Sequence, residues 1–168
     1  MREIVQKYTI YKYNELSEKI KEKLLEKEID NCIDDYAEIQ LEEDMKYKAK
    51  ELLEKYFGQK AQFNKVYYDL SYCQGCGAMI DFYINYYNLD IHIQHCGRYS
   101  HQNSFEIKYL DYAYLNDKRE NFLKEKVYDM NCEFTKFGYE MLEWENFIES
   151  AKENLEEYEF LENGEIFE

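Results

Sequence analysis

The spacing of apolar residues changes twice along this chain, and that change limits the folds open to it. In the first third, apolar side chains recur every three or four positions, which places them on one face of a helix. The pattern predicts helices near residues 13–24 and 43–57, with a short one between them capped by Asp30. Gly58 follows the last of these, where a C-terminal glycine is expected.

Between residues 63 and 110 the period falls to two, the spacing of a strand with one buried face. Four such runs follow one another, with short linkers between them, so we expect an antiparallel meander of four strands. We place five side chains on its exposed face: Tyr67, Asp69, Ser71, Asp81 and Tyr83.

The last third returns to a helical period, with eight apolar residues that step by four and three: Leu123, Val127, Met130, Phe134, Phe137, Met141, Trp144 and Ile148. We interpret this stripe as the core-facing side of a long C-terminal helix or helix pair, rather than as the seam of a coiled-coil dimer, and we expect a monomer. The fold class is therefore α+β, in a single domain over 1–168. Its parts are 1–58 (helical), 63–110 (sheet) and 116–168 (acidic helical region and tail, with a hairpin signal at Asn163-Gly164).

Cysteines and histidines gather in the sheet region, beginning with Cys73-Gln74-Gly75-Cys76-Gly77. Two cysteines separated by two residues, with glycines beside them, form a knuckle that turns both sulfurs toward one ion. The first and third strands of a meander end at the same edge, so the loop from Cys96 to His101 should approach this knuckle. We predict a zinc ion held by Cys73, Cys76, Cys96 and His101, with His95 as a substitute ligand. Four protein ligands leave no position for water, so the site would be structural.

The alternative is that Cys73 and Cys76 are ordinary small residues beside a glycine turn and that the histidines are surface or hydrogen-bonded residues. His92 should point away from the face of Ile91 and Ile93 and is the least favoured ligand. The other two of the five cysteines, Cys32 and Cys132, fall in predicted helices, where we expect buried thiols. An odd cysteine number and a start without an apolar signal stretch favour reduced thiols in the cytoplasm of a bacterial host.

Two segments carry a resemblance: Leu70-Ser71-Tyr72-Cys73-Gln74-Gly75-Cys76-Gly77-Ala78 and His95-Cys96-Gly97-Arg98-Tyr99-Ser100-His101. They resemble a largely uncharacterised family of small phage and mobile-element proteins. That family's signature is a strand ending in Ser-Gln-Gly-Asp-Gly-Ala, followed by a loop with His, Gly, Tyr and His. The match covers only the sheet region, about 40 to 50 residues. Cys76 stands where the family usually has Asp. In overall character the chain also resembles type II anti-CRISPR proteins, small inhibitors that bind an RNA-guided nuclease.

Acidic residues are concentrated at the end of the chain. The 36 Asp and Glu exceed the 21 Lys and Arg, for a net charge of -15, and the segment from Tyr139 onward holds eleven Glu against one Lys. The electric field of this negative charge repels nucleic-acid phosphates and attracts a basic partner. The segment is either a solvated face or a docking surface, for which we predict carboxylate contacts and two aromatic anchors: Glu149, Glu153, Glu156, Glu157, Glu159, Trp144 and Tyr158.

We find no phosphate-binding glycine loop and no serine nucleophile elbow in the sequence. We therefore expect a non-enzymatic inhibitor that binds a CRISPR effector nuclease and blocks DNA loading, without contacting nucleic acid or a membrane itself. The acidic tail or the sheet face would make the contact. A zinc-stabilised antitoxin or host-takeover adaptor explains the same features. The enzyme alternative is a cysteine-dependent hydrolase or redox protein that pairs Cys73 with His95 or His101.

Overall fold

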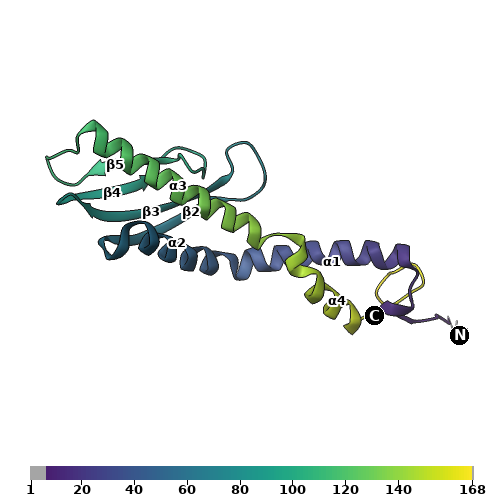
Figure 1. The fold of residues 1–168 in the computed structure, drawn as a ribbon. Coiled ribbons are helices and arrows are strands. Elements are labelled where there is room, and N and C mark those ends of the chain that lie inside the picture. Colours follow the sequence, from purple (N-terminus) through teal and green to yellow (C-terminus); the bar gives the residue numbers. More distant parts are fainter. Residues whose placement is uncertain (1–6, 168) are drawn as a thin grey trace, which may run out of the picture. The chain divides into compact units, whose positions relative to one another are not determined.

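The computed structural model describes residues 7–167, and the chain forms two compact units. The sheet unit is Gln40–Met141. The terminal unit combines the described residues before it, 7–39, with those after it, 142–167. Figure 1 shows the elements of both units. The chain thus leaves the terminal unit at Ile39 and re-enters it at Leu142.

The sheet unit contains a four-stranded antiparallel sheet in the order β2-β3-β4-β5, as the period-two pattern predicts. Its strands are β2 (Ala61–Asp69), β3 (Gly77–Tyr86), β4 (Leu89–His95) and β5 (Phe105–Tyr109). Two helices, α2 (Leu41–Phe57) and α3 (Asp117–Met141), contact β2 and β3 respectively, and they lie along the sheet in Figure 1. The predicted α+β class and the meander are confirmed.

The core of the sheet unit lies between the sheet and its two helices. Phe82 on β3 and Ile93 on β4 are fully buried, as are Leu52 on α2 and Phe134 on α3. The predicted stripe is correct over α3, where Leu123, Val127, Met130 and Phe134 are all 0% exposed. Burial of these side chains is the main stabilising contribution to this unit.

Two buried polar residues fix helix α3 on the sheet. Thr135 Oγ1 accepts a hydrogen bond from the N–H of Ala78 (2.8 Å), and Asn131 Oδ1 accepts one from the N–H of Ile80 (3.1 Å). Strand β4 pairs with β3 only from Phe82 onward. The helix side chains thus satisfy backbone donors that would cost free energy if buried without a partner.

The terminal unit packs α1 (Glu18–Ile39) against α4 (Ile148–Glu157). A short antiparallel pair joins β1 (Tyr11–Lys12) to β6 (Glu159–Phe160), and the core holds Tyr13, Leu16, Leu155 and Phe160. The predicted cap at Asp30 is wrong, because α1 continues through it. No glycine or proline interrupts residues 18–39, so no strong helix breaker ends the helix near Asp30.

Helix α3 ends at Met141, so the last two residues of the predicted apolar stripe, Trp144 and Ile148, do not belong to it. Trp144 begins a short 3₁₀ helix, Trp144–Phe147, and its side chain is 41% exposed. Its indole N–H donates a hydrogen bond to Asp30 Oδ1 at 3.4 Å, within the terminal unit. Further along, the Asn163-Gly164 turn is confirmed, since Gly164 N–H donates to Leu161 O and Phe160 pairs with Ile166.

Candidate functional site

The two loops that carry the predicted ligands meet at one end of the sheet. Strands β2 and β4 are both antiparallel to β3, so the loops that follow them, 70–76 and 96–104, leave the same end. Gly75 lies against the ring of Tyr99, such that a Cβ added to Gly75 would be 3.1 Å from ring carbons. A Cβ added to Gly77 would be 3.3 Å from the backbone carbonyl oxygen of Ser100. The predicted approach of the two loops is confirmed.

A group of three metal-ligand side chains lies in the first loop and at the strand end before it. The ligand atoms of Asp69, Cys73 and Cys76 all lie within 4.8 Å of one another, and no other group of three is present in residues 7–167. Cys73 and Cys76 form a disulfide, with their Cα atoms 5.3 Å apart. Metal ligation by cysteine requires thiolates. The group can therefore hold a metal ion after the disulfide is reduced.

Ser71 links the carboxylate and the sulfurs of this group. Its Oγ–H donates to Asp69 Oδ1 (2.6 Å), and its backbone N–H donates to the same oxygen (3.1 Å). These two bonds lower the pKa of Asp69, because they stabilise the charged form. The Asp69 carboxylate is therefore ionised at neutral pH and available as an oxygen ligand.

The structure does not bring the other predicted ligands into this group. Cys96 is half-buried. Its burial raises the pKa of its thiol, and the negative charge of the nearby Glu106 raises it further. His101 Nδ1 accepts a hydrogen bond from the N–H of Asn103. The substitute ligand, His95, stacks on Tyr67 with ring centroids 4.2 Å apart and donates from Nε2 to Tyr99 O. The quartet that the sequence predicts is not assembled here.

Asp69 is the member of this group that the sequence analysis did not predict as a candidate ligand. It is the last residue of β2 and lies four positions before Cys73, on the face that we assigned to solvent. The sequence did contain a signal for this candidate ligand, because a carboxylate stands only four residues before the first of the two cysteines. We expected Cys32 in α1 and Cys132 in α3 to be buried. Both are only half-buried.

A second polar cluster surrounds Asp81, which we expected to be exposed. Its side chain is only 3% exposed. It accepts hydrogen bonds from His92 Nε2 (2.7 Å), Asn64 Nδ2 (2.9 Å) and the backbone N–H of His95 (3.1 Å). The His92 ring in turn stacks on Tyr83, with ring centroids 4.1 Å apart. Asp81 is thus a buried acidic side chain whose oxygens accept hydrogen bonds from three donors, as burial of a polar group requires.

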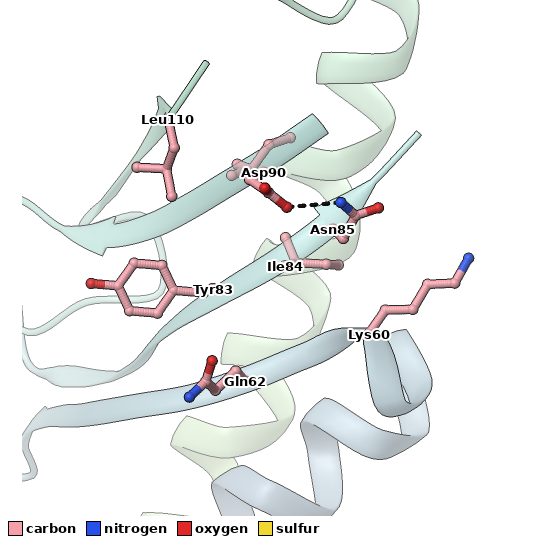
Figure 2. A pocket seen from close by; sticks show the side chains of 8 residues that line it. Lys60, Gln62, Tyr83, Ile84, Asn85, Asp90 and Leu110 are labelled. Carbon is pink, nitrogen blue, oxygen red and sulfur yellow. Dashed lines mark hydrogen bonds between the residues drawn. The ribbon is translucent and has the colours of Figure 1, made fainter. Parts of the chain in front are cut away.

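A recess of about 380 Å³ lies farther along the sheet. Figure 2 shows the side chains that line it, with helices behind the strands. Side chains from β2, β3 and β4 line it, including Gln62, Tyr83 and Asp90. Asn85 Nδ2 donates to Asp90 Oδ1 at 2.7 Å, the dashed line in Figure 2. None of its eight lining residues is Cys, His, Ser or Thr. The cysteines and histidines of the sheet unit that we predicted as ligands therefore lie outside this recess.

The predicted docking residues are exposed on and beside α4: Glu149, Glu153, Glu156, Glu157, Glu159, Trp144 and Tyr158. Two of them form ion pairs, Glu149 with Lys152 (3.3 Å) and Glu159 with Lys12 (3.1 Å). Within the described part of the chain, no ion pair involves the other three glutamates. Three carboxylates of this helix therefore have no ion-pair partner among residues 7–167.

No known protein family, no curated protein and no solved structure matches this chain. Among residues 7–167, none of the helices combines the length and the apolar character needed to cross a bilayer.

Proposed function

We propose that this chain is a non-enzymatic binding protein whose terminal unit docks on a cationic protein surface that otherwise holds nucleic acid. The observation that carries the proposal is the division of charge between the two units. Residues 1–39 and 142–168 hold 20 Asp and Glu against 8 Lys and Arg, a net charge of -12. Gln40–Met141 holds 16 against 13, a net charge of only -3. Such a concentrated field attracts a basic surface and raises the rate of association with it.

Helix α4 has one buried apolar face and one exposed face of glutamates that a basic partner could contact. Ala151 and Leu155, one turn apart, are buried in the terminal unit. Glu149, Glu153 and Glu156 step by four and three and so share the opposite, exposed face. Reversing their charge should therefore change the field without disturbing the core of the unit.

The partner that we propose is an RNA-guided CRISPR effector nuclease in the cytoplasm of a bacterial host. Such a nuclease keeps a positively charged channel for its guide–target duplex. A strongly acidic unit lodged in or beside that channel would prevent DNA from loading without any chemical step. Trp144 and Tyr158 are 41% and 43% exposed, and they offer aromatic anchors of the kind that dominate interface energetics.

A pull-down against a panel of guide-loaded nucleases, followed by a DNA-cleavage assay, tests the proposal. The expected result is capture of at least one nuclease and loss of its cleavage when this protein is added before DNA. Preincubation of the nuclease with DNA should protect it, because the channel is then occupied. If no nuclease is captured, the antitoxin or adaptor alternative is favoured instead.

We also propose that the ion for the loop group is zinc, bound after the disulfide is reduced. Two thiolates and a carboxylate are ligands that zinc accepts in tetrahedral sites. The facing loop supplies the fourth ligand, from Cys96 or His101, if it shifts toward the knuckle. The zinc would then tie the two loops together and stabilise that end of the sheet.

A further inference from the structure

The two cysteines of the loop differ in their access to solvent. Cys73 is exposed, whereas Cys76 is 8% exposed and lies just before β3. An external thiol can therefore reach the sulfur of Cys73 far more readily than that of Cys76. In thiol–disulfide exchange the accessible sulfur is the one attacked, and the other sulfur leaves as a thiolate.

The hydrogen bonding of the two sulfurs also favours attack on Cys73, with Cys76 as the leaving thiolate. The backbone N–H of Cys73 donates to Cys76 Sγ at 3.1 Å. Ser71 Oγ–H donates its single proton to Asp69 Oδ1, so the donor at Cys76 Sγ is this backbone N–H. Donors directed at a sulfur stabilise the thiolate that forms on it. Cys76 is therefore the better leaving group of the two.

We propose that the Cys73–Cys76 pair is a thiol–disulfide exchange site for low-molecular-weight thiols. A thiolate attacks Cys73 Sγ, a new S–S bond forms there, and the electron pair of the broken bond passes to Cys76 Sγ. A second thiol then attacks the small-molecule sulfur of the mixed disulfide and releases Cys73. Two thiols become one small disulfide, and their two protons end on Cys73 and Cys76. This activity does not depend on the acidic docking surface.

The exchange controls the metal group, and this consequence rests on the proposed zinc binding. In the disulfide state neither sulfur is a thiolate, and Asp69 is the remaining ligand of the three. In the reduced state all three ligand atoms are available. The loop thus alternates between a covalent bond and a metal-binding group, depending on the thiol supply.

Trapping the intermediate tests the proposal, with glutathione disulfide as the probe and peptide mass spectrometry as the readout. In Cys76→Ser the mixed disulfide should form on Cys73 at least about tenfold faster than it forms on Cys76 in the matched variant Cys73→Ser. Circular dichroism confirms that both variants remain folded. Equal rates at the two positions, or no mixed disulfide on Cys73, would overturn the assignment of roles.

The wild-type chain provides an independent readout that needs no variant. Samples equilibrated with glutathione at a series of reduced-to-oxidised ratios are alkylated rapidly and digested. Cys73 and Cys76 should change together from unlabelled to labelled, over a range in which Cys32, Cys96 and Cys132 stay labelled throughout. The proposal is wrong if the pair remains labelled at every ratio. Because no metal is added, this result is separate from any failure of zinc binding or of partner docking.

Discussion

Asp81 Oδ1 lies 2.7 Å from Nε2 of His92, on adjacent strands, and the His92 ring is stacked on Tyr83. The carboxylate also accepts the backbone N–H of His95 at the end of β4. One buried side chain therefore joins the centre of the sheet to the start of the 96–104 loop. This contact helps to fix the loop that faces Cys73 and Cys76.

Asp81→Ala should lower the free energy of unfolding by about 1 to 3 kcal/mol, because three donors lose their buried acceptor. Urea denaturation measures the change. Asp90→Ala is the matched control, since Asp90 is exposed and its carboxylate accepts a hydrogen bond from the side chain of Asn85. Its effect should stay within about 0.5 kcal/mol. Equal effects of the two substitutions would show that the Asp81 cluster contributes nothing to stability.

Gly75→Ala should destabilise the protein by about 1 to 2 kcal/mol. Gly75 has φ +99°, which an L side chain rarely adopts, and the new Cβ would crowd the Tyr99 ring. In the background of Tyr99→Ala the same substitution should cost at least about 0.5 kcal/mol less, because the steric contact is gone. Strictly additive effects in this double-mutant cycle would mean that the two loops do not touch in solution.

Reduced, chelator-stripped protein should bind about one zinc ion per chain, measured by elemental analysis after gel filtration. Cys73→Ser and Cys76→Ser should abolish binding and remove the thermal stabilisation that zinc confers. Cys32→Ser is the matched control, because Cys32 is a half-buried cysteine in the other unit. Less than about 0.2 zinc per chain in the reduced wild type would refute the zinc proposal.

Carbon-detected NMR titration of the carboxyl groups should give Asp69 a pKa below its ordinary value. Ser71→Ala should raise this pKa toward the ordinary value, because the Oγ–H donor is lost. A lowered carboxyl pKa stabilises the fold at pH above the unfolded value, and this contribution disappears as pH falls through the folded value. The acid limb of stability should therefore move to higher pH in Ser71→Ala. An unchanged pKa of Asp69 in this variant would exclude Ser71 as the cause.

The sequence was sufficient to predict the elements whose apolar period is regular over several turns or strands. The four strands and the part of α3 from Leu123 to Phe134 follow directly from the spacing of their apolar residues, because each element buries one face. The meander order then explains why the loops of Cys73 and Cys96 meet. Local pattern determines these features, so they could be predicted.

Long-range contacts account for what the sequence did not predict. The period of the stripe continues past Met141, but the chain leaves α3 there, and Trp144 packs with the terminal unit instead. In the alternating pattern of its strand, Asp81 falls at a position that we assigned to solvent. Its side chain is nevertheless buried, and it accepts hydrogen bonds from residues on β2 and β4. Asp69 joins the cysteines only because the loop folds back over the strand end. Such contacts depend on the assembled fold and leave no periodic signal.

The rate of association with the captured nuclease, measured at salt concentrations from about 0.05 to 0.5 M, tests the central claim most directly. Charge steering predicts that the wild-type rate falls about tenfold or more over this range. Glu153, Glu156 and Glu157 are the carboxylates to reverse to lysine, because they are exposed and form no ion pair among the described residues. The control variant reverses Glu54, Glu125 and Asp129, which are exposed on the sheet unit, and carries the same net charge. The account predicts that only the first variant loses fast association and inhibition of DNA cleavage. Equal inhibition by the two variants would contradict it.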